Sequence, residues 1–205
     1  MVSIGVYLEL LNRRIGHRFL YPGIGFGGSC FPQDVSALLK SGNGHNFNFS
    51  IIDAVLNVNN QQRIKLVDKV LDHFGDSEGK KFALGGLAFK PGTDDMREAP
   101  AIYVVKELVK RGAKVQAYDP KAIEEAQHFY LKDVAGISYF ESKYEVLKEA
   151  DALIMLTEWK EFRSPDFSEI KQQLSTPIIF DGRNQSNVFN LQDKGFEYHQ
   201  IGKQN

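Results

Sequence analysis

Residues 82–199 alternate short apolar runs with helical patterns, and this alternation restricts the fold more than any other feature of the sequence. Only short connections separate the runs from the helical patterns, which is typical of βαβ units. Such units build a parallel sheet covered by helices. We therefore predict an α/β fold with a doubly wound sheet, with strands near 82–87, 114–118, 137–140, 152–156, 177–180 and 196–199, helices near 99–111, 143–149 and 167–173, and short helices near Lys121 and Val188.

A long helical pattern precedes this region, from Phe49 to Phe74, with apolar residues recurring at spacings of three and four. At 1.5 Å per residue it would extend for about 40 Å, which is long for one globular domain. Such a helix usually connects domains or forms an interface. The alternative is a core helix broken near Asn59, where four polar residues interrupt the apolar stripe. Because Gly75 and a charged stretch follow, we predict two parts, residues 1–76 and 77–205.

The stretch from residue 23 to residue 34 combines four glycines with the only cysteine of the chain. Pro32 suits the first turn of a helix, so we expect Cys30 just before a helix N-terminus, whose positive end favours a thiolate. Asp34 would lie on the same face one turn later. A thiol and a carboxylate beside a glycine loop suit covalent catalysis. The alternative is a buried structural cysteine, with Asp34 only favouring the helix start.

Charged side chains follow several predicted strands, at the end of a parallel sheet where ligands bind. Lys90 and Arg97 follow the first strand and Arg183 follows a later one, so together they could hold a phosphate. The alternative for each is a solvated surface position. Asp119 follows the second strand, where an acidic residue either meets a ribose or opens an Asp-Pro turn. Trp159 is interpreted as structural.

The composition of the 205 residues argues against several classes of function. A net charge of −1 does not indicate nucleic acid or a membrane surface as partner, and no apolar run approaches the length of a membrane span. One cysteine excludes an internal disulfide and fits a reducing compartment, so we expect a cytoplasmic protein. The five histidines do not have the spacing of metal ligands, and no metal site is expected.

Several segments resemble one protein family, the nucleotide-sugar 6-dehydrogenases of the UDP-glucose/GDP-mannose dehydrogenase family. The stretch GIGFGGSCFPQD at 23–34 matches the family pattern GxGFGGSCFPKD, with Gln33 where lysine is usual. The segments RRIG at 13–16, FKPGTDDMRE at 89–98 and FDGRN at 180–184 also match. The resemblance extends from about Arg14 to the C-terminus, whereas residues 1–12 do not follow the family pattern.

The resemblance implies an enzyme that oxidises UDP-glucose to UDP-glucuronate with NAD as cofactor. Cys30 would form a thiohemiacetal and then a thioester with the substrate, and Asp34 would hold or activate water. Cys30 and Arg97 would also contact NAD. The implied substrate-binding residues are Arg14, Phe19, Leu20, Tyr21, Gly23, Phe26, Gly27, Phe89, Lys90 and Arg183.

The resemblance also implies a homodimer formed through the long helix, followed by a Rossmann-like domain that binds the UDP-sugar. In such a dimer Arg14 would reach the substrate of the neighbouring subunit. No GxGxxG motif follows a predicted strand, so we expect the NAD domain of the family to be absent and the chain alone to be inactive. The alternatives are a non-catalytic nucleotide-sugar-binding or dimerisation module, or a related UDP-sugar or GDP-mannose 6-dehydrogenase.

Overall fold

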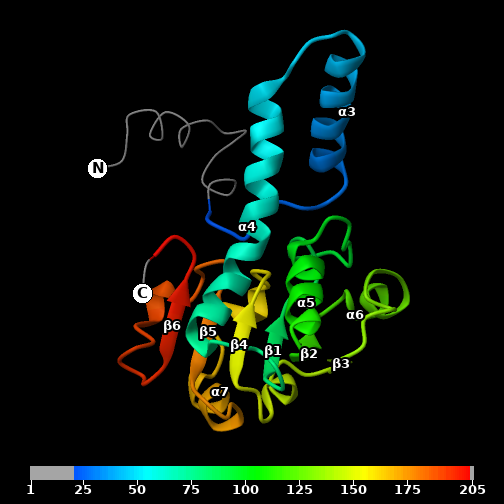
Figure 1. Cartoon of the computed structure of the whole chain (residues 1–205). Coiled ribbons are helices and arrows are strands. Elements are labelled where there is room, and N and C mark those ends of the chain that lie inside the picture. Colours follow the sequence, from blue (N-terminus) through cyan, green and yellow to red (C-terminus); the bar gives the residue numbers. More distant parts are fainter. Residues whose placement is uncertain (1–20, 204–205) are drawn as a thin grey trace.

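A computed structural model describes residues 21–203, in which a helical hairpin projects from a sheet domain (Figure 1). The sheet has six strands in the order β3-β2-β1-β4-β5-β6, and every neighbouring pair is parallel. This confirms the predicted α/β fold with a parallel sheet. The strands are β1 (Lys81–Gly85), β2 (Lys114–Tyr118), β3 (Ile137–Tyr139), β4 (Ala152–Met155), β5 (Ile178–Asp181) and β6 (Glu197–Gln200).

The helices follow the predicted order with one exception. The helix expected at 143–149 is wrong, since only a short 3-10 turn forms there. The amide of Glu149 donates to the carbonyl of Gln173 at 3.0 Å and not to a carbonyl of the preceding turn, and Glu149 has a φ of 58°, so the chain leaves the helical conformation there. The described helices are α3 (Cys30–Gly44), α4 (Ser50–Phe74), α5 (Pro100–Lys110), α6 (Ile123–Glu125) and α7 (Phe167–Gln173), with a π-helical turn at Ala126–Tyr130 and 3-10 turns at Glu145–Leu147, Lys160–Phe162 and Asn187–Phe189.

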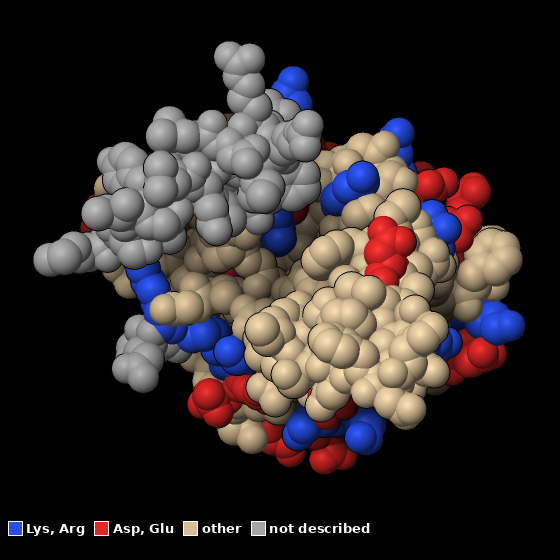
Figure 2. All heavy atoms as spheres, turned by 90° about the horizontal axis from the view of Figure 1, so that it is seen from above, with Lys and Arg blue, Asp and Glu red and all other residues tan. Residues whose placement is uncertain are grey.

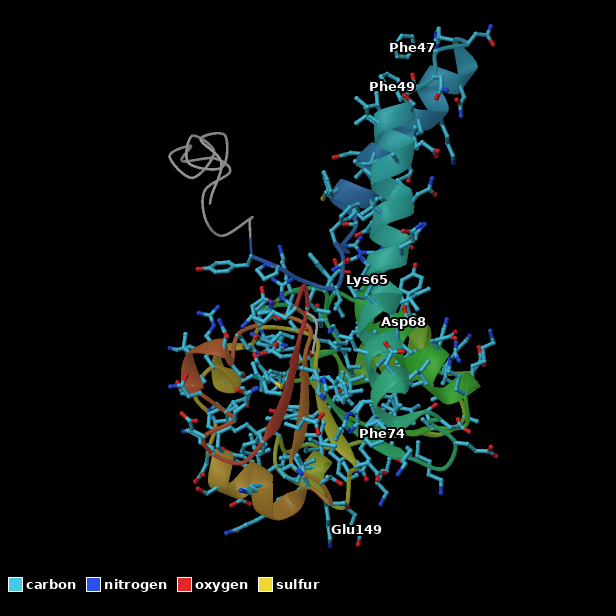
Figure 3. All side chains as sticks on the ribbon, turned by 60° about the vertical axis from the view of Figure 1, so that its left-hand side comes forward. Phe47, Phe49, Lys65, Asp68, Phe74 and Glu149 are labelled. Carbon is cyan, nitrogen blue, oxygen red and sulfur yellow. The ribbon has the colours of Figure 1, made fainter. Side chains whose placement is uncertain are left out.

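Helix α4 is continuous over 25 residues, so the alternative of a helix broken near Asn59 is wrong. Its first half lies beside α3 in the projecting hairpin, with Phe47 and Phe49 at the tip (Figure 3). Their rings pack edge to face with centroids 4.7 Å apart. Its second half lies on the sheet, and Phe74 packs there against Phe82 at 5.4 Å. A single helix therefore links the hairpin to the core.

The core has two layers of side chains, one on each face of the sheet. Helices α4 and α5 cover one face, where Leu66 and Val70 of α4 are fully buried. Helix α7 covers the other face, and its Ile170 lines a small apolar cavity together with Leu153 and Ile179 of the sheet. Because all strands are parallel, their carboxyl ends meet at one end of the domain, the end from which the hairpin projects (Figure 1). Among residues 21–203, no helix has both the length and the apolar character needed to cross a bilayer.

Candidate active site

The glycine loop, which we define as residues 21–29, runs across the carboxyl ends of the strands before it enters α3. Ile24 is its anchor, because this side chain is buried and lies with Leu66 against Gly182, the residue that follows β5. Burying an isoleucine side chain contributes about 2 kcal/mol. The loop is therefore part of the domain core at this point and is not a free surface segment.

The polar residues that interrupt the apolar stripe of α4 hold the backbone of the glycine loop through hydrogen bonds. Gln62 donates from Nε2 to the carbonyl of Gly23 at 2.9 Å. Asn59 is buried, and its side-chain amide makes two bonds to one residue. Its Oδ1 accepts from the amide of Phe26 at 2.7 Å, and its Nδ2 donates to the carbonyl of Phe26 at 3.2 Å. These residues were not predicted to be functional; the signal in the sequence was their position in one polar cluster on a long helix.

Arg63, one turn after Asn59, joins the glycine loop to the loop that follows β1. Its Nη2 donates to the carbonyl of Phe26 at 3.1 Å and to that of Glu98 at 3.3 Å. Its Nη1 donates to the Glu98 carboxylate at 3.1 Å, and the guanidinium lies 4.2 Å from the ring centroid of Tyr103. A buried cation must be paired in this way to be tolerated. Burial raises the pKa of Tyr103, with the bond to Glu98 acting in the same direction.

The two loops also touch directly, through glycines. The amide of Gly28 donates to the carbonyl of Arg97 at 2.7 Å. Gly28 has a φ of 87°, and a Cβ at this position would lie 2.8 Å from the ring of Phe89. A Cβ on Gly27 would lie 2.5 Å from the carbonyl oxygen of Glu98. Both glycines are therefore needed for this close approach of backbone to backbone and backbone to ring.

Cys30 is the first residue of α3 and is exposed, in agreement with the predicted place at a helix start. Its Sγ lies 3.7 Å from Oγ of Ser29. Asp34 is exposed one turn later on the same helix. The amide of Gly28, two residues before Cys30, donates to the carbonyl of Arg97 at 2.7 Å. The structure thus places an accessible thiol next to a loop that is bonded to the backbone of Arg97.

The loop after β1 carries Lys90 and Arg97, the two basic residues predicted to follow the first strand. Arg97 is held by Asp95 through two bonds, from Nε at 3.0 Å and from Nη2 at 2.7 Å. This pairing lowers the pKa of Asp95. The Arg97 side chain still has 55% of its surface exposed, so it remains available to an anion. Lys90 is exposed, with Nζ at 5.0 Å from the ring centroid of Phe89.

Arg183 lies on the loop after β5, and its guanidinium packs against Gly23 of the glycine loop. Its Nε pairs with Glu158 at 2.8 Å. The buried carboxylate of Asp181 accepts from the amides of Arg183 and Ser186, both at 2.9 Å, and thereby shapes the turn. The structure therefore places Arg183 against the glycine loop. The sequence could not show this contact, because the two segments are far apart in the chain.

Asp119 is a structural residue, so the possible ribose contact is wrong and the turn interpretation is confirmed. It is 1% exposed. One oxygen accepts from the amides of Lys121 and Ala122, both at 2.9 Å, which forms the turn after β2. The other accepts from Nε1 of Trp159 at 3.0 Å and from the amides that follow β1, Leu87 and Ala88. The structural interpretation of Trp159 is confirmed by the same bond.

A groove of about 610 Å³ lies between α3, α4 and the loop after β1. Figure 2 looks onto this end of the molecule, where Lys and Arg side chains reach the surface around a hollow. Of the other predicted site residues, Tyr21 is exposed, and Phe26 packs edge to face on Phe31 with centroids 4.6 Å apart. Arg14, Phe19 and Leu20 lie outside the described residues. The groove is lined among others by Phe26, Gln33, Lys40, Asn60, Arg97 and Tyr130.

A parallel sheet with basic loops at the carboxyl ends of its strands is the arrangement of nucleotide-binding α/β proteins. The chain matches the models of two domains of the UDP-glucose/GDP-mannose dehydrogenase family, the central domain at residues 8–61 and the UDP binding domain at residues 83–188. Among curated proteins, the UDP-glucose 6-dehydrogenase TuaD of Bacillus subtilis is 42% identical over 193 residues, which are 94% of this chain and 41% of that protein.

Two further relatives agree. The UDP-glucose 6-dehydrogenase of Pseudomonas aeruginosa is 41% identical over 195 residues, 94% of this chain and 43% of the relative. The structure of a UDP-glucose dehydrogenase from Pyrobaculum islandicum superposes with a TM-score of 0.77 at 30% identity, covering 94% of this chain and 41% of that one. The chain therefore belongs to the UDP-glucose/GDP-mannose dehydrogenase family. It spans about two fifths of the length of these relatives.

Proposed function

We propose that this chain is the substrate-binding and nucleophile-bearing part of an NAD-dependent UDP-glucose 6-dehydrogenase, which oxidises UDP-glucose to UDP-glucuronate. The observation that carries the proposal is the joining of two loops: the loop that leads to Cys30 is bonded to the loop that carries Lys90 and Arg97, through Gly28 and the carbonyl of Arg97 at 2.7 Å. A thiol and two cations therefore share one end of the sheet. The names of the relatives support the substrate.

Cys30 performs the covalent chemistry in this proposal. The C6 alcohol first loses a hydride and its hydroxyl proton to give the aldehyde. The Cys30 thiolate then adds to C6, and the resulting alkoxide takes up a proton to give a thiohemiacetal. Loss of a second hydride from C6 and of the hydroxyl proton converts this adduct to a thioester, and water then attacks it, releasing the carboxylate, the Cys30 thiolate and protons. An aldehyde does not lose hydride readily until a nucleophile has added, which is why a thiol is needed at this step. Asp34, one turn further along α3, holds or activates the water.

NAD⁺, when bound, supplies the hydride acceptor for both oxidations. The chain offers it the exposed guanidinium of Arg97, which borders the groove and carries a charge suited to a diphosphate. Cys30 follows the glycine loop, whose Gly28 is bonded to the backbone of Arg97, so the two residues would face the cofactor together. The cofactor contacts of this chain are then limited to Cys30 and Arg97.

The UDP-sugar is held in this proposal by Arg183 and Lys90, with the glycine loop and Phe89 beside them. Residues 77–205 form the UDP-sugar-binding domain, and residues 1–76 carry the nucleophile and the helices of a homodimer. The exposed apolar residues Ile51 and Val58 on α4, with 80% and 60% of their surface accessible, favour a second copy of the chain as the group that covers them.

Calorimetry with UDP tests the assigned binding residues. Losing the two charge-assisted contacts of Lys90→Ala and Arg183→Ala costs on the order of 3 kcal/mol, so we expect the double variant to bind UDP about a hundredfold more weakly. Lys110→Ala with Arg111→Ala is the matched control, because it removes the same two residue types from the far end of α5. Equal affinity in the double variant and the control would exclude the assigned site.

Activity is tested by fusing the N-terminal part of a relative such as TuaD to this chain. We expect about two NADH per UDP-glucose, and no product beyond the aldehyde from Cys30→Ala. A folded fusion that oxidises no nucleotide sugar would defeat the proposal. A preference for GDP-mannose would instead replace the substrate and keep the reaction.

A further inference from the structure

Three potential metal ligands meet where the end of α4 reaches the edge strand β6. His73 lies in the last turn of α4, and Glu197 and His199 occupy alternate positions of β6. Nδ1 of His73 is 3.0 Å, and Nε2 of His199 2.9 Å, from the same oxygen of Glu197. The three ligand atoms all lie within 4.8 Å of one another. We propose that these side chains bind one divalent transition-metal ion, of which Zn²⁺ is the best match.

Aromatic packing orients both imidazoles. The ring of His199, which is 4% exposed at its side chain, stacks on Phe180 with centroids 4.5 Å apart and an angle of 11°. The ring of His73 packs edge to face on Phe74 at 4.7 Å, on Phe180 at 6.0 Å and on His199 at 5.1 Å. Phe74, labelled in Figure 3, marks this end of α4 against the sheet. The rings are thus held by the core, so little conformational entropy is lost when they bind an ion.

The geometry suits a tetrahedral ion after a small adjustment. Zn²⁺ binds imidazole nitrogen and carboxylate oxygen at about 2.0–2.2 Å, which places the ligand atoms about 3.3–3.6 Å apart. The two nitrogen–oxygen separations are shorter than this by a few tenths of an ångström, and the nitrogens are no more than 4.8 Å apart. Two histidines and one carboxylate leave the fourth position for water, as in open zinc sites.

The site is accessible from solvent. Glu197 has 52% of its side chain exposed, and a surface groove of about 760 Å³ is lined by Glu197 and His199 together with other residues of the β6 region. An ion therefore has an entry path and room for a bound water. None of the three residues lines the groove between α3, α4 and the loop after β1, so the ion would serve stability: it would tie the end of α4 to β6, whose one strand neighbour within residues 21–203 is β5.

Sequence spacing did not indicate this site, because His73 is separated from the other two ligands by most of the sheet domain. Only the two residues on β6 are near one another in the chain, and a single Glu-x-His pair is too common to predict a metal. The fold alone brings the third ligand to them.

Zn²⁺ binding to the whole chain tests the proposal, measured by competition with a chromophoric chelator near neutral pH. All proteins carry Cys30→Ser, which removes the thiol as a ligand. We expect one Zn²⁺ per chain, and binding at least tenfold weaker in Glu197→Gln and in His73→Gln. His45→Gln and His128→Gln are the controls, because both histidines are exposed and lie outside the cluster. Their affinity for Zn²⁺ should equal that of the parent.

A second measurement is the melting temperature with and without Zn²⁺. At a hundredfold excess over Kd the ion should raise Tm by about 5–10 °C in the parent and the controls, and not in the cluster variants. Glu197→Gln keeps the shape of an exposed side chain, so its fold should persist and its circular dichroism will show this. Unchanged Zn²⁺ affinity in both cluster variants, or equal loss in the controls, would overturn the proposal and leave a pairing of Glu197 with the two histidines only.

Discussion

The substitution Asn59→Ala removes the two hydrogen bonds by which α4 holds the backbone of Phe26. The side-chain amide of Asn59 accepts from the Phe26 amide at 2.7 Å and donates to its carbonyl at 3.2 Å. Each bond contributes about 0.5–1.5 kcal/mol, which gives about 1–3 kcal/mol for both. The carbonyl keeps its bond to Arg63 at 3.1 Å, so the loss falls mainly on the amide, and we expect about 1.5 kcal/mol.

Asn57→Ala is the matched control for this prediction. Asn57 is exposed on the same helix, and its side chain makes only a 3.4 Å contact with Asp53. Both substitutions replace asparagine by alanine inside a helix and gain the same helix propensity, about 0.5 kcal/mol. The difference between the two variants therefore reports the bonds to the glycine loop together with the packing of the buried Asn59 side chain.

Urea unfolding and amide hydrogen exchange are the two assays. The free energy of unfolding of Asn59→Ala should lie about 1.5 kcal/mol below that of Asn57→Ala, with Tm lower by about 3–6 °C. If the loop opens locally while the domain stays folded, the amide of Phe26 should exchange about tenfold faster in Asn59→Ala. Equal unfolding free energies together with equal exchange rates in Asn59→Ala and Asn57→Ala would refute the view that Asn59 holds the glycine loop in place.

Three further predictions follow from burial and exposure. Burial, with the nearby Glu161 carboxylate, raises the pKa of Tyr118 to about 12. Because the pKa in the unfolded chain is near 10, the stabilising contribution of Tyr118 is complete below about pH 10 and is lost as pH rises through 12. Urea titrations should therefore show the free energy of unfolding falling in this range, and falling less steeply in Tyr118→Phe. Light scattering should give a dimer for the wild type and a monomer for Ile51→Glu with Val58→Glu; a monomeric wild type would contradict the proposed interface. Iodoacetamide should label Cys30 rapidly near neutral pH and several-fold more slowly in Arg97→Ala, and an unchanged rate would exclude electrostatic help from that arginine.

Local periodicity carried most of the fold prediction. The strand at 114–118 and the helix at 167–173 were predicted with the bounds that the structure shows, because burial on a sheet or helix face leaves a direct trace in the order of residues. The helix at 143–149 was wrong because the amide of Glu149 bonds to the carbonyl of Gln173, at the end of α7, and Glu149 has a left-handed φ of 58°. A helical pattern in the sequence does not show such tertiary competition.

The glycine loop and Cys30 were located from the sequence, whereas their support was not. On a helix viewed alone, Asn59, Gln62 and Arg63 are polar residues that interrupt an apolar stripe, and solvent or a break in the helix explains them equally well. Their partners are backbone groups more than thirty residues away, which leave no periodic pattern. Asp119 was ambiguous for the same reason, since its carboxylate binds Leu87 and Trp159, which are more than thirty residues away in the chain.

The shared guanidinium of Arg63 has a consequence for engineering substrate specificity. One side chain bonds to the carbonyls of both Phe26 and Glu98, and Gly27 lies against the same carbonyl of Glu98, so each loop is held in part by the other and by α4. The smallest transplantable unit is therefore discontinuous. If the glycine loop is grafted from one relative to another, the polar turn of α4 at 59–63 and the segment at 96–98 must be grafted with it. Without these two segments the loop lacks the contacts that fix its conformation.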